Sequence, residues 1–128
     1  MEGRWPVSPK EPRRSAERVT PALAERVADA MFALSTPSRV QILGSLLDGP
    51  RSVSEIVELL MMEQSAVSHQ LRVLREHGLV TVERVGRRRV YALADAHVVA
   101  LLEESLRHAE ARSGLQTGLR LRVRRSKG

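Results

Sequence analysis

The segment from Gln64 to Arg75 carries the side chains whose types and spacing are most informative. Apolar Val67, Leu71 and Leu74 recur at the spacing that buries one face of a helix. A second stripe is polar and basic, and its members are Ser65, Ser68, His69, Arg72 and Arg75. Hydroxyl, imidazole and guanidinium groups suit the base edges and phosphates of a DNA major groove. We therefore expect this face to contact DNA, with Gln64 adding a contact at the helix N-terminus, where backbone N–H groups favour a phosphate.

A concentration of arginines accompanies this helix. Residues 64–93 contain Arg72, Arg75, Arg84, Arg87, Arg88 and Arg89, opposed only by Glu76 and Glu83. Three consecutive arginines would repel one another without an acidic cluster nearby, whereas a minor groove or a phosphate backbone would offset that cost. Arg87 and Arg88 are therefore predicted DNA contacts. The alternative interpretation of these side chains is an ordinary solvated surface.

Helical periodicity and cap signals predict the elements that position these groups. Thr20-Pro21 and Thr36-Pro37 each place a capping hydroxyl before a first-turn proline. The expected helices cover residues 21–34, 37–48, 54–60, 64–77 and 95–113. Residues 79–85 and 89–93 are expected to form two strands joined by a turn at Gly86-Arg87. A tight turn between two helices, followed by a hairpin, indicates a mainly α winged helix-turn-helix fold.

Charge and composition divide the 128-residue chain, whose formal net charge is +6, into three parts. Residues 1–19 are rich in proline, serine and charge and are expected to be a flexible arm. Residues 20–113 form the predicted domain, and residues 114–128 are expected to be a flexible basic tail. One domain of this size has a marginal core, which favours a dimer.

Composition also excludes several classes of function. The chain has no cysteine, which rules out disulfides, thiolate metal sites and cysteine nucleophiles. It has no run of about 18 apolar residues and no continuous apolar leader, so we expect a cytoplasmic protein without a membrane partner. It lacks a glycine-rich phosphate loop, an activated nucleophile pattern and paired catalytic carboxylates, so we expect no enzyme activity.

Three segments of the chain resemble the ArsR/SmtB family of winged helix-turn-helix repressors. They are residues 33–39 (ALSTPSR), 62–75 (MEQSAVSHQLRVLR) and 78–80 (GLV), within a resemblance that covers about residues 22–110. Residues 64–75 are most similar to the nickel- and cobalt-sensing NmtR branch. The resemblance implies a homodimer joined through terminal helices, a recognition helix in each major groove of operator DNA, and repression relieved by an inducer.

Asp95, His97 and His108 resemble the metal site that the family carries on its final helix, where ligands from both subunits meet. The two histidines would face within about 20° of each other yet lie about 16 Å apart along one helix, so one ion cannot bind both within a single chain. Two antiparallel copies would bring Asp95 and His97 of one chain to His108 of the other, creating two equivalent sites. Nitrogen and oxygen ligands favour Zn, Ni or Co over thiophilic ions.

The predicted metal site departs from the family pattern at Ala111, where a further ligand is expected. Glu104, Glu110 or water are the candidates to complete it; otherwise the site is lost and the inducer differs. Asp95 is also a natural helix N-cap and His108 suits a helix C-terminus, so both have a purely structural interpretation. Two functions therefore remain: a repressor released from DNA by a divalent metal, and a metal-independent regulator or architectural DNA-binding protein.

Overall fold

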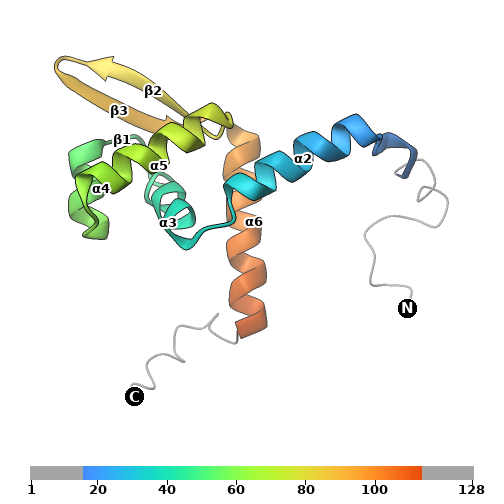
Figure 1. The fold of residues 1–128 in the computed structure, drawn as a ribbon. Coiled ribbons are helices and arrows are strands. Elements are labelled where there is room, and N and C mark those ends of the chain that lie inside the picture. Colours follow the sequence, from blue (N-terminus) through green and yellow to red (C-terminus); the bar gives the residue numbers. More distant parts are fainter. Residues whose placement is uncertain (1–15, 114–128) are drawn as a thin grey trace.

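The computed structural model describes residues 16–113 (Figure 1). The predicted tail at 114–128 and most of the predicted arm at 1–19 lie outside the described residues. Residues 16–18 form a helical turn. The later elements are α2 (Pro21–Ala33), α3 (Pro37–Ser45), β1 (Arg51–Ser52), α4 (Val53–Leu60), α5 (Gln64–Glu76), β2 (Val80–Val85), β3 (Arg88–Leu93) and α6 (Ala96–Ser113). This order confirms the predicted mainly helical winged helix-turn-helix fold.

Side-chain caps start four of these helices. The hydroxyls of Thr20 and Thr36 accept hydrogen bonds from the backbone of α2 and α3, as both Thr-Pro pairs predict. Ser52 caps α4 in a capping box with Glu55, and Asp95 accepts from the third backbone N–H of α6 at 3.0 Å. One predicted boundary is wrong, because α3 ends at Ser45 and the next three residues form turns.

The core lies where α3, α4 and α5 pack together. Its largest fully buried side chains are Ile42, Leu43, Ile56, Val67, Leu71 and Leu74. The last three are the predicted apolar stripe of α5. Because that stripe is wholly buried, the polar stripe of the same helix must face outward.

The wing is a three-stranded antiparallel sheet in the order β1-β3-β2. Val85 pairs with Arg88 at the closed end of the hairpin, and Gly86 supplies the left-handed conformation that this turn needs, with φ 65°. The sequence did not predict β1, because a strand of two residues has no periodicity to detect. Its pairing with β3 joins the base of the wing to the start of α4.

The first and last long helices project from this body (Figure 1). Along α2 only Ala33 is buried, whereas Val27, Met31 and Phe32 are exposed. Along α6 only Val98 and Leu102 are buried. Among residues 16–113, none of the helices combines the length and the hydropathy that a membrane-spanning segment needs.

Candidate nucleic-acid interface

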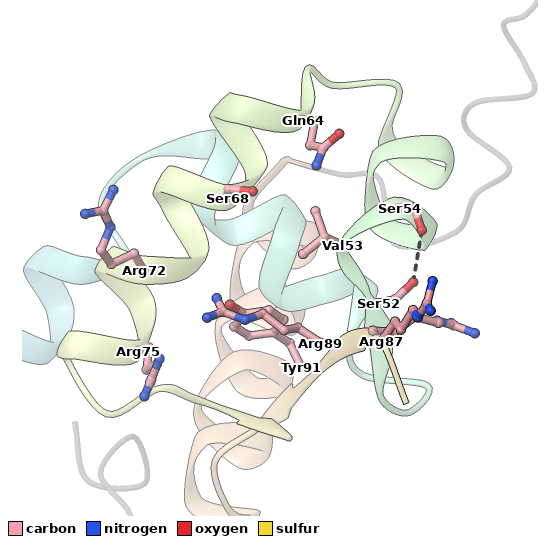
Figure 2. A pocket seen from close by; sticks show the side chains of 11 residues that line it. Ser52, Val53, Ser54, Gln64, Ser68, Arg72, Arg75, Arg87, Arg89 and Tyr91 are labelled. Carbon is pink, nitrogen blue, oxygen red and sulfur yellow. Dashed lines mark hydrogen bonds between the residues drawn. The ribbon is translucent and has the colours of Figure 1, made fainter. Parts of the chain in front are cut away.

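An open groove runs between α5 and the wing (Figure 2). Six of its lining residues are among the predicted DNA contacts, namely Gln64, Ser68, Arg72, Arg75, Arg87 and Arg88. The other lining residues are Ser52, Val53, Ser54, Arg89 and Tyr91. All five charged residues that line it are arginines, and no carboxylate is among them. The groove therefore combines positive charge with hydroxyl and amide groups.

The turn of α5 decides which of its polar residues reach the groove. Gln64, Ser68, Arg72 and Arg75 lie on the groove side of the helix (Figure 2). At about 100° per residue, Ser65 and His69 are rotated from Ser68 by roughly 60° and roughly 100°. Both are exposed but line no part of the groove. The structure thus divides the predicted α5 stripe into a groove side and an adjoining outer side.

The wing arginines differ in their surroundings. The Arg88 guanidinium lies 3.2 Å from the Glu55 carboxylate, and both side chains are about half exposed. Hydrogen bonding from the backbone N–H of Ser52, aided by the Arg88 charge, lowers the pKa of Glu55 from its ordinary value. Arg87 forms no such ion pair with any residue that the structure describes. The two predicted wing contacts are therefore not equivalent.

Sequence reasoning did not include Ser54, Arg89 and Tyr91 in the site. Arg89 belongs to the run of three arginines, a signal that could have included it. Ser54 and Tyr91 reach the groove because β1 pairs with β3 and so carries the start of α4 beside the wing. That pairing joins residues about forty positions apart in the sequence, beyond the range of any periodicity argument.

The predicted metal ligands are separated along α6. Asp95 Oδ1 lies 3.7 Å from His97 Nδ1 at the start of the helix, and the same oxygen accepts the capping hydrogen bond from Val98 N. The His97 side chain is 98% exposed, and His108 is exposed farther along the helix. Within residues 16–113 no group of three or more histidine or carboxylate side chains could hold an ion. One protomer thus supplies at most part of a metal site.

Two further side chains, one on α6 and one at the end of α5, have structural partners. Glu104, a candidate replacement ligand, is paired with Arg107 at 2.7 Å. His77 is the C-cap of α5, and its Nδ1 lies 2.9 Å from the carbonyl oxygen of Val73. His77 therefore has a structural role at the end of α5.

Comparison with known sequences places this chain among bacterial regulators. Residues 36–82 match the family model described as bacterial regulatory protein, arsR family. The HTH-type transcriptional regulator NmtR of Mycobacterium tuberculosis is 54% identical over 87 residues, which cover 68% of this chain and 72% of that protein. The transcriptional repressor SmtB homolog of Synechocystis sp. is 39% identical over 87 residues, which cover 68% of this chain and 66% of that protein.

Comparison with solved structures indicates the same family. A homodimeric winged helix-turn-helix DNA-binding domain from Mycobacterium bovis, described as a possible ArsR-family regulator, superposes with a TM-score of 0.66 at 34% identity and covers 70% of this chain and 82% of that chain. The solution structure of apo-NmtR has a TM-score of 0.59 at 46% identity and covers 87% of each chain. The curated relatives above are named as regulators or repressors of transcription, which confirms the prediction of a DNA-binding regulator rather than an enzyme. The chain belongs to the ArsR family of bacterial regulatory proteins.

Proposed function

We propose that the protein is a cytoplasmic repressor that binds double-stranded operator DNA with α5 in the major groove and the wing against the adjacent backbone. The observation that carries this proposal is the groove between α5 and the wing, with its five arginines and no carboxylate. Such a surface attracts phosphates at any sequence, while the polar side chains of α5 can discriminate bases. Ser65 and His69, on the outer side of α5, are proposed to contact the flanking strand.

The proposed active form is a homodimer joined through α2 and α6. Val27, Met31 and Phe32 are 45%, 55% and 66% exposed on α2, an apolar surface that a second copy would cover. The related domain from Mycobacterium bovis is itself homodimeric. A twofold dimer would present two copies of α5 to successive turns of the duplex.

The DNA-binding proposal is tested with a duplex that the wild-type protein selects from a random-sequence pool. Arg72→Ala is expected to weaken binding to that duplex by about 1 to 3 kcal/mol if the guanidinium reaches a base. Arg112→Ala is the matched control, because Arg112 is an exposed arginine on α6 outside the groove. Equal affinities for the two folded variants would reject the assignment of α5 as the reading element.

The proposed inducer is a divalent ion, Zn, Ni or Co. Asp95 and His97 of one protomer, with the partner's His108, would hold it, and the bound ion would link the two copies of α6. The support is that Asp95 and His97 are neighbours and are both exposed. If the ion favours a dimer that fits DNA less well, reciprocal coupling requires that it lower the affinity for operator DNA. With Ala111 in place of a further ligand, we expect weaker metal binding than in a complete site.

The metal proposal predicts complementation between two variants that each fail to respond to metal. His97→Ala and His108→Ala are each expected to keep DNA binding but to lose release by metal, whereas Glu103→Gln, an exposed change on the same helix, keeps both. Mixing the two histidine variants should restore about one site per heterodimer, because one of its two interfaces then retains both histidines. Full metal release in both single variants would remove the proposed site and leave the DNA-binding assignment intact.

A metal-independent regulator or architectural protein is the second candidate function. It is favoured by Ala111, which stands where the family pattern expects a further ligand. Operator binding that stays unchanged with Zn, Ni and Co would support the metal-independent regulator. Equal affinity for the selected duplex and for random DNA would support the architectural role.

A further inference from the structure

A buried arginine joins α2 to α5, the proposed recognition helix. Arg39, on α3, is only 9% exposed and forms no ion pair within the part of the chain that the structure describes. Its Nε donates to the carbonyl oxygen of Ala33 at 2.6 Å, and Nη2 lies 3.5 Å from that of Phe32. Its Nη1 donates to the side-chain Oε1 of Gln70 at 3.1 Å. One guanidinium thus bridges two elements besides its own helix.

The two carbonyls lie at the C-terminus of α2. Carbonyls in the last turn of a helix lack intrahelical partners and favour a nearby positive charge, and α2 has no basic residue in its own last turn. Arg39 supplies that charge from α3. Because α2 buries only Ala33, core packing along its length does little to fix its direction. Ser35 also donates to the Phe32 carbonyl oxygen from its backbone N at 3.0 Å and its hydroxyl at 2.7 Å. Arg39, through its short bond to the Ala33 carbonyl oxygen, is the contact that ties this end of α2 to α3 and α5.

The third partner, Gln70, belongs to α5 but faces away from the groove. At about 100° per residue it is rotated from Ser68 by roughly 160°, and it is half-buried. Gln70 therefore cannot share the DNA-facing side with Ser68. Any effect of Gln70 on DNA recognition must act through the placement of α5.

We infer that Arg39 is a positioning residue that fixes the angle between α2 and α5, and thereby the spacing of the two recognition helices in the dimer. This inference rests on the proposed function, in which α2 forms part of the dimer interface. Half-site spacing in DNA mirrors the separation of recognition helices in a twofold dimer. A rigid connection from α2 to α5 makes that separation a fixed property of the dimer.

Spacing discrimination is the property to measure. The probes are a palindromic duplex selected by the wild-type protein and the same duplex with one base pair inserted between its half-sites. The wild type is expected to lose about tenfold or more in affinity on insertion, because the half-sites shift in distance and rotation. Gln70→Met keeps the side-chain length but removes the acceptor. For this variant, the loss of DNA affinity on insertion is expected to shrink to about threefold or less.

Further variants separate an effect on helix placement from an effect on the stability of the fold. Gln41→Met makes the same chemical change at an exposed position of α3, and it should lose as much DNA affinity on insertion as the wild type does. Gln70→Glu restores an acceptor for Arg39 and should restore discrimination. Arg39→Lys keeps the charge but lacks the planar fork that donates to α2 and α5 together, so it should behave like Gln70→Met.

The outcomes are distinguishable from failure of the proposed function. If Gln70→Met and Arg39→Lys both retain the wild-type loss on insertion, the Arg39 contact only stabilises the fold and the inference is wrong. The inference is also wrong if Gln70→Met lowers the melting temperature without changing the loss of affinity on insertion. If the wild type selects no sequence from the pool, the proposed function fails first.

Discussion

At the scale of single residues, Glu55 serves two partners with its two carboxylate oxygens. Oε1 accepts from the backbone N–H of Ser52 at 2.8 Å and completes the cap of α4, while Oε2 lies 3.2 Å from Arg88 Nη2. A half-exposed ion pair adds little to stability. The ion pair with Glu55 does, however, weaken the electrostatic attraction between Arg88 and a phosphate. Arg87, by contrast, lines the same groove without such a partner among the described residues.

This difference predicts unequal salt dependence for the two wing arginines. In a plot of the logarithm of DNA affinity against the logarithm of salt concentration, each phosphate neutralised by the protein steepens the downward slope by about 0.9. Arg87→Gln should reduce the slope by about one such unit, and Arg88→Gln by clearly less. Binding titrations at several salt concentrations measure both slopes. Equal reductions would show that Glu55 does not hold Arg88 in the DNA-bound state.

The lowered pKa of Glu55 predicts how pH acts on this corner of the molecule. A carboxylate whose pKa is lower when folded stabilises the fold above its unfolded pKa, and that contribution is lost as the pH falls through the folded value. The wild type should therefore melt at a higher temperature than Glu55→Gln at neutral pH, and the gap should close below the ordinary glutamate range. Thermal melts from neutral to acidic pH measure the gap, with Glu58→Gln as an exposed control on α4. A gap independent of pH would contradict this account.

Local patterns in the sequence predicted correctly which side chains of α5 are buried. Helical spacing alone separated the buried Val67, Leu71 and Leu74 from the polar side of α5, and the structure confirms that division. Which polar residues face the wing depends on tertiary packing, so Ser65 and His69 could not be distinguished from Ser68. The buried position of Arg39 was likewise unpredictable, since its partners come from two other helices.

At the scale of elements, the tight turn between α4 and α5 contains a backbone conformation unusual for its residue. Met61 ends α4 with φ 57° and ψ 46°, in the left-handed region that favours glycine, and its side chain is 90% exposed. The side chain therefore contributes little packing to offset the backbone strain. Gly78, just after α5, has φ 73°, and a Cβ added there would meet no atom within 4 Å other than those of its chain neighbours.

Opposite substitutions at these two positions should have opposite effects. Met61→Gly should raise the free energy of unfolding by about 0.5 to 1 kcal/mol, because relief of strain exceeds the added chain entropy of glycine. Gly78→Ala should lower it by about 1 to 2 kcal/mol, since strain is introduced without a steric clash. Chemical denaturation of both variants measures these changes. Destabilisation by Met61→Gly would mean that the exposed methionine makes a contact that matters in the assembled protein.

At the scale of the whole molecule, the order of helices and strands was predictable because caps and periodicity are local signals. The Thr-Pro starts of α2 and α3 and the hairpin turn at Gly86 occur where the sequence places them. The third strand was not predictable, since it exists only through pairing with residues far along the chain. The exposed apolar surface of α2 accords with the predicted dimer, whose geometry belongs to the assembly rather than to one chain.

The central claim is that a dimer reads DNA with two copies of α5. Hydroxyl-radical footprinting of the wild-type protein on its selected duplex tests this claim most directly, because it locates protein on the DNA without any substitution. Recognition helices in successive major grooves predict two protected regions related by a dyad, about one helical turn or 10 base pairs apart. A single protected region, or uniform protection along the duplex, would contradict the account.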